Sequence, residues 1–215
     1  MRFLCISDIH GHADALEAVL AEANERGFDQ LLVCGDLCFP GPRPLDVWKL
    51  LVSHKAVCVQ GLTDRAVALL DPNTLNPSDE RQRDRLERLR SVHAELGEII
   101  VTRLRLLPPI AQLPLESGHT LIMVHGCPSD PSESLSPDMS DEELLAALGD
   151  HPFDLVICGG SHQPFDRSVE DVRIVNVGSV GEAPGGGYAD ATIIHTTATG
   201  IHVEQFVVPL NADSD

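Results

Sequence analysis

The sequence predicts an α/β fold in which two sheets form a sandwich. In residues 1–61, apolar strands alternate with helices in the order strand, helix, strand, helix, strand, which favours a largely parallel sheet covered by helices. In the second half, two further apolar runs each end close to a histidine and a glycine. From Val172 onward, apolar and polar residues alternate between glycine-rich turns, as expected of antiparallel strands that close a second sheet.

The first half supplies three strands and two helices. After a strand that ends at Ile6, apolar residues recur at helical spacing through 13–23, and Gly27 is a suitable stop. A second strand is expected over 31–34. The last two elements expected in this half are a helix over 45–53 and a strand over 56–59.

The middle segment, 79–107, differs from the rest because arginines gather there in an otherwise acidic chain. We expect one or two charged helices. One interpretation is a solvated helix face on which Glu and Arg alternate; the other is a cap-like segment that contacts a partner or a second copy of the chain. The arginines are Arg81, Arg83, Arg85, Arg88, Arg90, Arg103 and Arg105.

Pro108 and Pro109 end this helical stretch. The two apolar runs that follow, 110–115 and 119–124, predict a hairpin. Ser140 and Glu143 have the spacing of a capping box, so a helix is expected to begin after Ser140. A buried strand over 155–158 follows that helix.

Composition narrows the choice of function. The 215 residues suit one domain spanning 1–215, and nothing in the sequence indicates a linker. A formal charge of −18 argues against an extended nucleic-acid surface, which gains affinity from Lys and Arg, but leaves a small phosphorylated substrate open. The cysteines lack the spacing of a disulfide framework, and no signal peptide or membrane span is evident, so we expect a cytoplasmic protein.

Residues of the types that bind metals follow the first two predicted strands. In an extended segment, residues two apart project to the same side, so Asp8 and His10 can bind one cation. The strand 31–34 then places Asp36 at a comparable junction between strand and loop. Alternatively, Asp8 and Asp36 cap the helices after their strands by accepting backbone N–H groups.

Two histidines stand at comparable positions in the second half. His125 comes directly after an apolar strand and precedes a glycine, and His162 follows the strand 155–158 and two glycines. A lone histidine is more often an ordinary hydrogen-bonded residue. A turn beside glycine exposes these side chains at strand ends, however, so we interpret both as candidate metal ligands.

Taken in order, these motifs resemble those of the calcineurin-like metallophosphoesterases, in particular the small single-domain phosphodiesterases of bacteria and archaea. The resemblance spans nearly the whole chain. It implies a four-layer α/β/β/α sandwich of two mixed sheets flanked by helices, with a dinuclear metal centre at the strand ends. The motifs are Asp8-Ile9-His10-Gly11, Gly35-Asp36, Gly61-Leu62-Thr63-Asp64, Val124-His125-Gly126, Gly159-Gly160-Ser161-His162 and the run from Asn176 to Gly181.

By this resemblance, the first metal position is intact and the second is degenerate. The first would be held by Asp8, His10, Asp36 and His162, a mixed N and O set suited to Mn, Fe or Zn. The second would keep only Asp36, which bridges the two ions, and His125. We therefore expect one firmly bound ion and a weak second site.

Two substitutions cause this degeneracy. Leu62 stands where the family pattern has an asparagine ligand, and Gly160 stands where it has a histidine ligand. Nearby Thr63, Ser161 and His12 are candidate replacement donors or water-holding residues, although no spacing rule requires it.

The resemblance also provides candidate catalytic residues. They are His125, which would contact substrate or a weak second metal, with His12 and Asp64 beside it. Asp64 is alternatively a turn residue that supports the site, and the run from Asn176 to Gly181 reads as a structural loop against it.

The favoured function is a metal-dependent phosphoesterase in which metal-bound hydroxide attacks a phosphodiester or nucleotide-type phosphoester. The alternative is a catalytically weak or silent member of the same fold that acts as a binding or scaffolding module. The missing asparagine and histidine favour the alternative, and the intact first set of ligands argues against it. A third interpretation is that Gly160 makes room for an unusual substrate.

Overall fold

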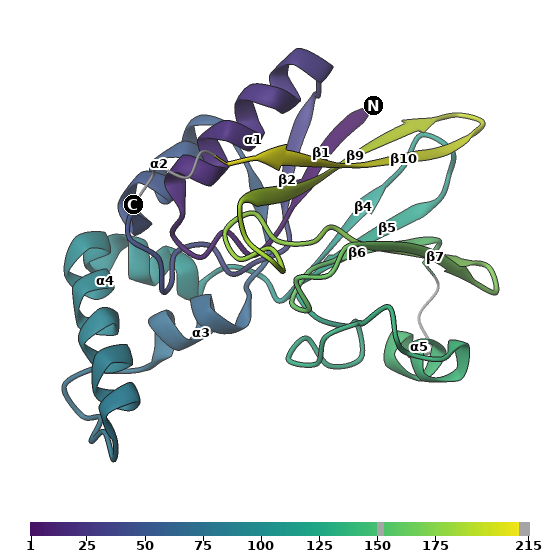
Figure 1. The fold of residues 1–215 in the computed structure, drawn as a ribbon. Coiled ribbons are helices and arrows are strands. Elements are labelled where there is room, and N and C mark those ends of the chain that lie inside the picture. The colour runs from purple at the N-terminus through teal and green to yellow at the C-terminus, as the bar shows by residue number, and fades with distance from the viewer. Residues whose placement is uncertain (150–152, 211–215) are drawn as a thin grey trace.

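Two five-stranded mixed sheets face each other, and helices cover their outer sides (Figure 1). The computed structural model describes residues 1–149 and 153–210. In the first sheet, the strand order is β10-β9-β1-β2-β3. Its strands are β1 (Arg2–Ile6), β2 (Gln30–Val33), β3 (Val57–Cys58), β9 (Tyr188–Thr197) and β10 (Gly200–Pro209).

The second sheet has the order β4-β5-β6-β8-β7. β5, β6 and β8 are parallel neighbours, while β4 and β7 run antiparallel at the two edges. The predicted hairpin is confirmed as β4 and β5. The strands of this sheet are β4 (Ile110–Pro114), β5 (Thr120–Val124), β6 (Leu155–Cys158), β7 (Phe165–Val169) and β8 (Val172–Asn176).

One expectation for the C-terminal third is wrong. Its strands do not all close the second sheet, because β9 pairs with β1 and β10 pairs with β9 in the first sheet. Only β8 joins the second sheet, beside β7, which begins at Phe165, ahead of the expected start at Val172. The residue alternation indicates strands correctly but contains no information on which sheet each strand joins.

Five helices lie in the described part of the chain, and four of them, α1 to α4, contribute side chains to the apolar cluster on the outer side of the first sheet. A capping box confirms the expected start of α5, since Ser140 Oγ accepts from Glu143 N–H and Glu143 Oε2 accepts from Ser140 N–H. The short α3 was not expected from the sequence. The helices are α1 (Ala13–Arg26), α2 (Pro44–Ser53), α3 (Leu62–Leu69), α4 (Glu80–Arg105) and α5 (Asp141–Leu148).

The arginine-rich segment forms α4, which breaks at Gly97, where φ is 68° and ψ is 168°. The helix extends away from the sheets at its N-terminal end (Figure 1). Several of its arginines bind backbone carbonyls of neighbouring segments: Arg88 Nε donates to Pro40 O at 2.6 Å, and Arg105 Nη2 donates to Ala68 O at 2.6 Å. Part of the arginine-rich face therefore holds α4 against the molecule.

The apolar core follows the alternation of side chains along the strands. Along β1, Leu4 and Ile6 face the helices, while Phe3 and Cys5 face the second sheet. On the far side of the second sheet, Val156 of β6 packs in a third cluster that includes residues of α5. These three apolar clusters separate four layers, as expected for an α/β/β/α sandwich.

All six cysteines are free thiols. Burial raises the pKa of Cys58 to about 12 and raises that of Cys5 further, so these thiols act as small core residues. Among the described helices, none has the length and apolar character needed to cross a bilayer.

Candidate metal centre

The loops after β1 and β2 carry the candidate ligands in an unusual backbone conformation. Asp8, His10 and Asp36 have φ of 53°, 51° and 54°, and His162, after β6, has φ of 58°. Side chains other than glycine seldom adopt this left-handed region, although Asp and His are among those that tolerate it. Such conformations persist where surrounding structure enforces them, and they cluster at functional sites.

Backbone hydrogen bonds enforce this geometry by joining the first two loops. Asp8 N–H donates to Gly35 O at 3.1 Å, and His10 N–H donates to Asp36 O at 2.9 Å. The two strand ends predicted from sequence therefore lie side by side, as the carboxyl ends of adjacent parallel strands must.

Each aspartate uses one carboxylate oxygen to accept a backbone N–H and turns the other toward an imidazole. Asp8 Oδ2 accepts from Gly160 N–H at 2.9 Å, and Asp36 Oδ1 accepts from Thr63 N–H at 2.8 Å. The remaining Asp8 Oδ1 lies 3.2 Å from His162 Nε2, and Asp36 Oδ2 lies 3.5 Å from the Nε2 atom of His125.

The three histidines share one arrangement that fixes their tautomer. Their Nδ1 atoms face backbone carbonyls: that of His10 lies 2.7 Å from Phe39 O, that of His125 lies 2.8 Å from Cys34 O, and that of His162 lies 3.1 Å from Glu182 O. A carbonyl only accepts, so Nδ1 carries the proton, and in a neutral ring Nε2 then offers a lone pair. Metal-binding histidines are commonly oriented in this way.

The electrostatics of the site favour a bound cation. Burial alone would raise the pKa of Asp8, but the close approach of His162 and the charge of His125 lower it overall. Burial would lower the pKa of His125, but Asp36 and Asp8 raise it overall. Asp8 thus favours its anionic form, and the negative charges of Asp8 and Asp36 stabilise the protonated, cationic form of His125, as they would stabilise a metal cation.

These residues fit a divalent cation. Ligand atoms of Asp8, His10 and His162, and separately of Asp8, Asp36 and His125, lie within 4.8 Å of one another. Asp8 Oδ1 is buried and, although it lies close to His162, has no hydrogen-bond partner of suitable geometry. Buried carboxylate oxygens rarely stay unsatisfied, and this mixture of N and O donors suits Mn, Fe or Zn.

The two positions that depart from the expected pattern offer no donor atom. Leu62 begins α3 with 43 % of its surface exposed. Gly160 has a φ of 74°, and a Cβ there would lie 2.7 Å from Ser134 Oγ and 3.5 Å from His125 Nε2. The space beside His125 that an imidazole at residue 160 would enter therefore borders the hydroxyl of Ser134.

Asp64 is directed at the backbone of the loop after β2. Its Oδ2 accepts from the N–H groups of Asp36 at 2.9 Å and Gly61 at 3.0 Å, and its Oδ1 accepts from Leu37 N–H at 3.0 Å. Burial raises its pKa to about 6, and the Asp36 carboxylate adds to the rise. This geometry positions Asp36, in agreement with the interpretation of Asp64 as a supporting turn residue.

Loop residues expected near the site do lie there. A Cβ built on Gly181 or Gly41 would approach His12 Cδ2 to 2.7 or 3.0 Å, so the imidazole of His12 is packed between two loops. Ser161 Oγ accepts from Asn176 Nδ2 at 2.9 Å, which holds the loop that carries His162.

The sequence reasoning missed two residues at the site. Glu182 Oε2 lies 3.8 Å from His10 Nε2, and its carbonyl accepts from His162. It follows directly after the run from Asn176 to Gly181, so extending that motif by one residue would have included it. Ser134 comes from the segment between β5 and α5, and no local pattern marked it.

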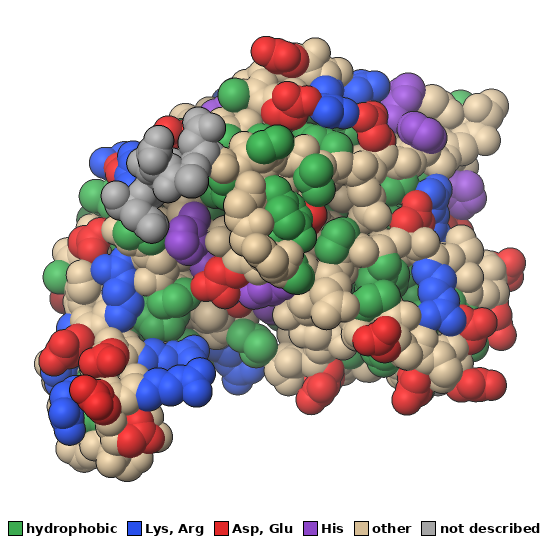
Figure 2. Space-filling view, viewed as in Figure 1, with side chains coloured by type: hydrophobic (Ala, Val, Ile, Leu, Met, Phe, Trp, Pro, Cys, Tyr) green, Lys and Arg blue, Asp and Glu red, His purple; other side chains and the backbone are tan. Residues whose placement is uncertain are grey.

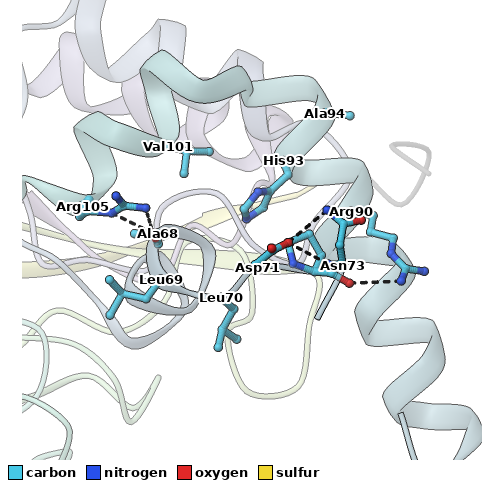
Figure 3. Close-up of a pocket in the computed structure, with 11 residues that line it drawn as sticks. Ala68, Leu69, Leu70, Asp71, Asn73, Arg90, His93, Ala94, Val101 and Arg105 are labelled. Atoms are coloured by element: carbon cyan, nitrogen blue, oxygen red, sulfur yellow. Dashed lines mark hydrogen bonds between the residues drawn. The ribbon is translucent and has the colours of Figure 1, made fainter. Parts of the chain in front are cut away.

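Histidine and acidic side chains meet near the middle of the face shown in Figure 2, above a recess between the part that carries α4 and the part that carries α5. A separate pocket of about 630 Å³ lies between α4 and the end of α3 (Figure 3). There His93 Nε2 lies 2.8 Å from Val67 O, and Arg90 Nη2 donates to Pro72 O at 3.2 Å. None of the candidate ligands lines this pocket.

The fold and the site together define an α/β sandwich protein with a candidate metal centre at the carboxyl ends of its strands. The family model of the calcineurin-like phosphoesterase superfamily domain matches residues 1–199, and the chain belongs to this family. This match confirms the resemblance expected from the sequence motifs. Members of the superfamily use divalent metals.

Individual proteins are similar to this chain in sequence or in fold. The chain is 28% identical over 182 residues to an uncharacterized protein of Methanocaldococcus jannaschii, covering 81% of this chain and 68% of the relative. It has the fold of a hypothetical protein from Pyrococcus horikoshii, with a TM-score of 0.81 and 21% identity, covering 98% and 89% of the two chains. A metallophosphoesterase from Sphaerobacter thermophilus superposes with a TM-score of 0.76 and 22% identity, with the same coverage of 98% and 89%.

Proposed function

We propose that this protein, as one domain over residues 1–215, is a metal-dependent phosphoesterase that hydrolyses a phosphodiester or a nucleotide-type phosphoester. Asp8, His10, Asp36 and His162 hold the principal ion, which is Mn, Fe or Zn. The observation that carries the proposal is the shared orientation of the histidines: each turns Nδ1 to a backbone carbonyl and Nε2 toward the buried carboxylates.

The bound cation supplies Lewis-acid chemistry, which activates water and neutralises charge on the phosphoryl group. The protein contributes a rigid frame for that cation. Asp64 fixes the backbone of Asp36, and Gly160 N–H fixes one oxygen of Asp8 so that the other faces the site. His125 lies beside Asp36, where it would contact substrate or a second ion. His12 adjoins this frame as a further candidate for substrate contact.

A second candidate function is a binding or scaffolding module. The observation in its favour is a set of exposed leucines on α3 and at its end, since Leu62, Leu69 and Leu70 are 43%, 57% and 42% exposed. Ile99 and Leu106, within the arginine-rich segment 79–107, are exposed by 79% and 69%. Exposed apolar side chains of this kind, where they form one patch, often mark protein contacts, with a partner or with a second copy of the chain.

The first test measures metal content and hydrolysis of bis-p-nitrophenyl phosphate with added Mn²⁺. The wild-type protein is compared with Asp36→Asn, and Asp71→Asn serves as a control because Asp71 is exposed and remote in sequence from the ligands. We expect bound metal and turnover in the wild type and the control, and loss of both in Asp36→Asn.

A thermal measurement accompanies this test. A ligand present at 100 times its dissociation constant stabilises the folded state by about 2.7 kcal/mol. For a chain of this size, Mn²⁺ should then raise Tm by roughly 5–11 °C, and EDTA should reverse the rise. Bound metal without turnover on phosphoesters would favour the binding module, and a protein that binds no metal would refute the metal-dependent function.

A further inference from the structure

Two hydroxyl groups stand beside the positions where the second cation lacks its expected ligands. Thr63 directly follows Leu62, and the Ser134 hydroxyl adjoins Gly160. Each hydroxyl is therefore next to one of the two substituted positions. The remaining family ligands of this cation are Asp36, which accepts the Thr63 N–H, and His125, which borders the same space at Gly160 as Ser134. Asp36 Oδ2 and His125 Nε2 lie 3.5 Å apart.

Thr63 Oγ1 is a buried oxygen without a hydrogen-bond partner. Such a group destabilises the folded chain unless a ligand, an ion or a water satisfies it, so it needs an explanation. Thr63 is also tied to the site, because its backbone N–H donates to Asp36 Oδ1 at 2.8 Å. It lies in the first turn of α3, where the Cα–Cβ bond leans toward the helix N-terminus and hence toward the loop of Asp36.

Gly160 leaves a space where the second missing ligand would lie. A Cβ at this position would lie 2.7 Å from Ser134 Oγ and 3.5 Å from His125 Nε2, so the Ser134 hydroxyl and His125 flank the same small space. Ser161, the other hydroxyl expected there, already accepts from Asn176 Nδ2 at 2.9 Å and serves the loop. Ser134 is thus the hydroxyl placed to replace the missing imidazole.

We propose that the chain has rebuilt its second cation position with two hydroxyl oxygens, from Thr63 and Ser134, beside Asp36 Oδ2 and His125 Nε2. This inference rests on the proposed function, because Asp36 is shared with the principal ion. The set has one nitrogen and three oxygens, and two of the oxygens are neutral. It therefore takes a hard divalent cation, Mn²⁺ or Mg²⁺, with lower affinity than the first position has.

The test is a titration of the metal-free protein with Mn²⁺, in which free Mn²⁺ is followed by electron paramagnetic resonance. We expect the wild type to bind two ions, one tightly and one weakly. Thr63→Val keeps the shape of the side chain but removes the oxygen, and we expect it to weaken the second ion by at least about tenfold. Ser134→Ala should act in the same direction, and Thr63→Ser should restore binding.

Thr192→Val is the matched control. Its hydroxyl is also buried without a partner, but it lies in β9 opposite Cys5, within the first sheet. It should leave both ions unchanged. Metal-free Thr63→Val should be at least as thermostable as the wild type, since removing an unsatisfied hydroxyl does not weaken the fold. The rise in Tm caused by Mn²⁺ should be smaller in this variant.

The outcomes separate this inference from the proposed function. A wild-type protein that binds one ion would overturn the rebuilt second position and leave the principal site standing, and a protein that binds none would overturn both. Two ions bound with unchanged affinity by Thr63→Val and by Ser134→Ala would show that neither hydroxyl takes part.

Discussion

Removal of the Asp64 carboxylate should destabilise the protein through the backbone of the loop after β2. Asp64 is 1% exposed, and its two oxygens accept from three backbone N–H groups. These donors belong to Asp36, Leu37 and Gly61, which surround the candidate metal centre. No local secondary structure pairs these N–H groups, so this one side chain satisfies them all.

The geometry predicts different costs for two substitutions. Asp64→Ala leaves three buried donors unpaired, each costing about 1–3 kcal/mol. Asp64→Asn can keep its carbonyl oxygen on the Asp36 and Gly61 donors, so that only the Leu37 donor meets an amide NH₂. Because burial and Asp36 raise the pKa of Asp64, Asn also removes a carboxylate whose charge is costly there. Asn leaves the Leu37 N–H and its own NH₂ unpaired, one donor fewer than the three that Ala leaves, so Asn should be the more stable variant by about 1 kcal/mol.

Urea unfolding followed by circular dichroism measures this difference, and the metal-free protein should be used so that ion binding does not contribute. Asp71→Ala is a suitable control: Asp71 Oδ1 accepts from Asn73 N–H at 2.9 Å, but the pair is exposed, so water replaces the lost bond. The control should change stability by less than about 0.5 kcal/mol. Equal stability of the Asn and Ala variants would refute this account of Asp64.

Two further predictions follow from close contacts and capping. Gly61→Ala should abolish Mn²⁺ binding, because its Cβ would lie 2.1 Å from Asp36 Oδ1, whereas Gly200→Ala meets nothing within 4 Å and should bind normally in the same titration. Ser140→Ala removes the cap of α5 and should cost about 1 kcal/mol, read as a Tm lower by about 2–4 °C. Normal metal binding by Gly61→Ala, or an unchanged Tm in Ser140→Ala, would contradict the respective argument.

Much of the fold could be predicted because its signals are local. The strand ending at Ile6, the periodic helix that became α1 and the capping box of α5 each depend on neighbours in sequence. The sheet membership of the C-terminal strands could not be predicted, since β9 pairs with β1 across almost the whole chain. The short α3 is not predicted either, because its first residues, Leu62 to Asp64, are interpreted only as part of a site motif.

The candidate site likewise contains residues that local sequence predicts and residues that only the fold brings there. Asp8, His10, Asp36, His125 and His162 all stand at strand ends, and parallel strands bring those ends to one edge. Two other residues reach the site from loops, and only the fold places them there. They are Ser134 and Glu182.

The backbone determines more of this site than its side chains do, and this explains how two family ligands can be absent while the rest stays in place. Three imidazoles are oriented by carbonyl groups, and Asp8 and Asp36 are oriented by N–H groups. None of these contacts involves the side chain of Leu62 or requires a side chain at Gly160. Changes at those two positions therefore alter the donors offered to a second cation and leave the frame of the first intact. For this reason the number of ions bound, measured beside turnover, is the property that distinguishes a rebuilt two-ion site from a one-ion site.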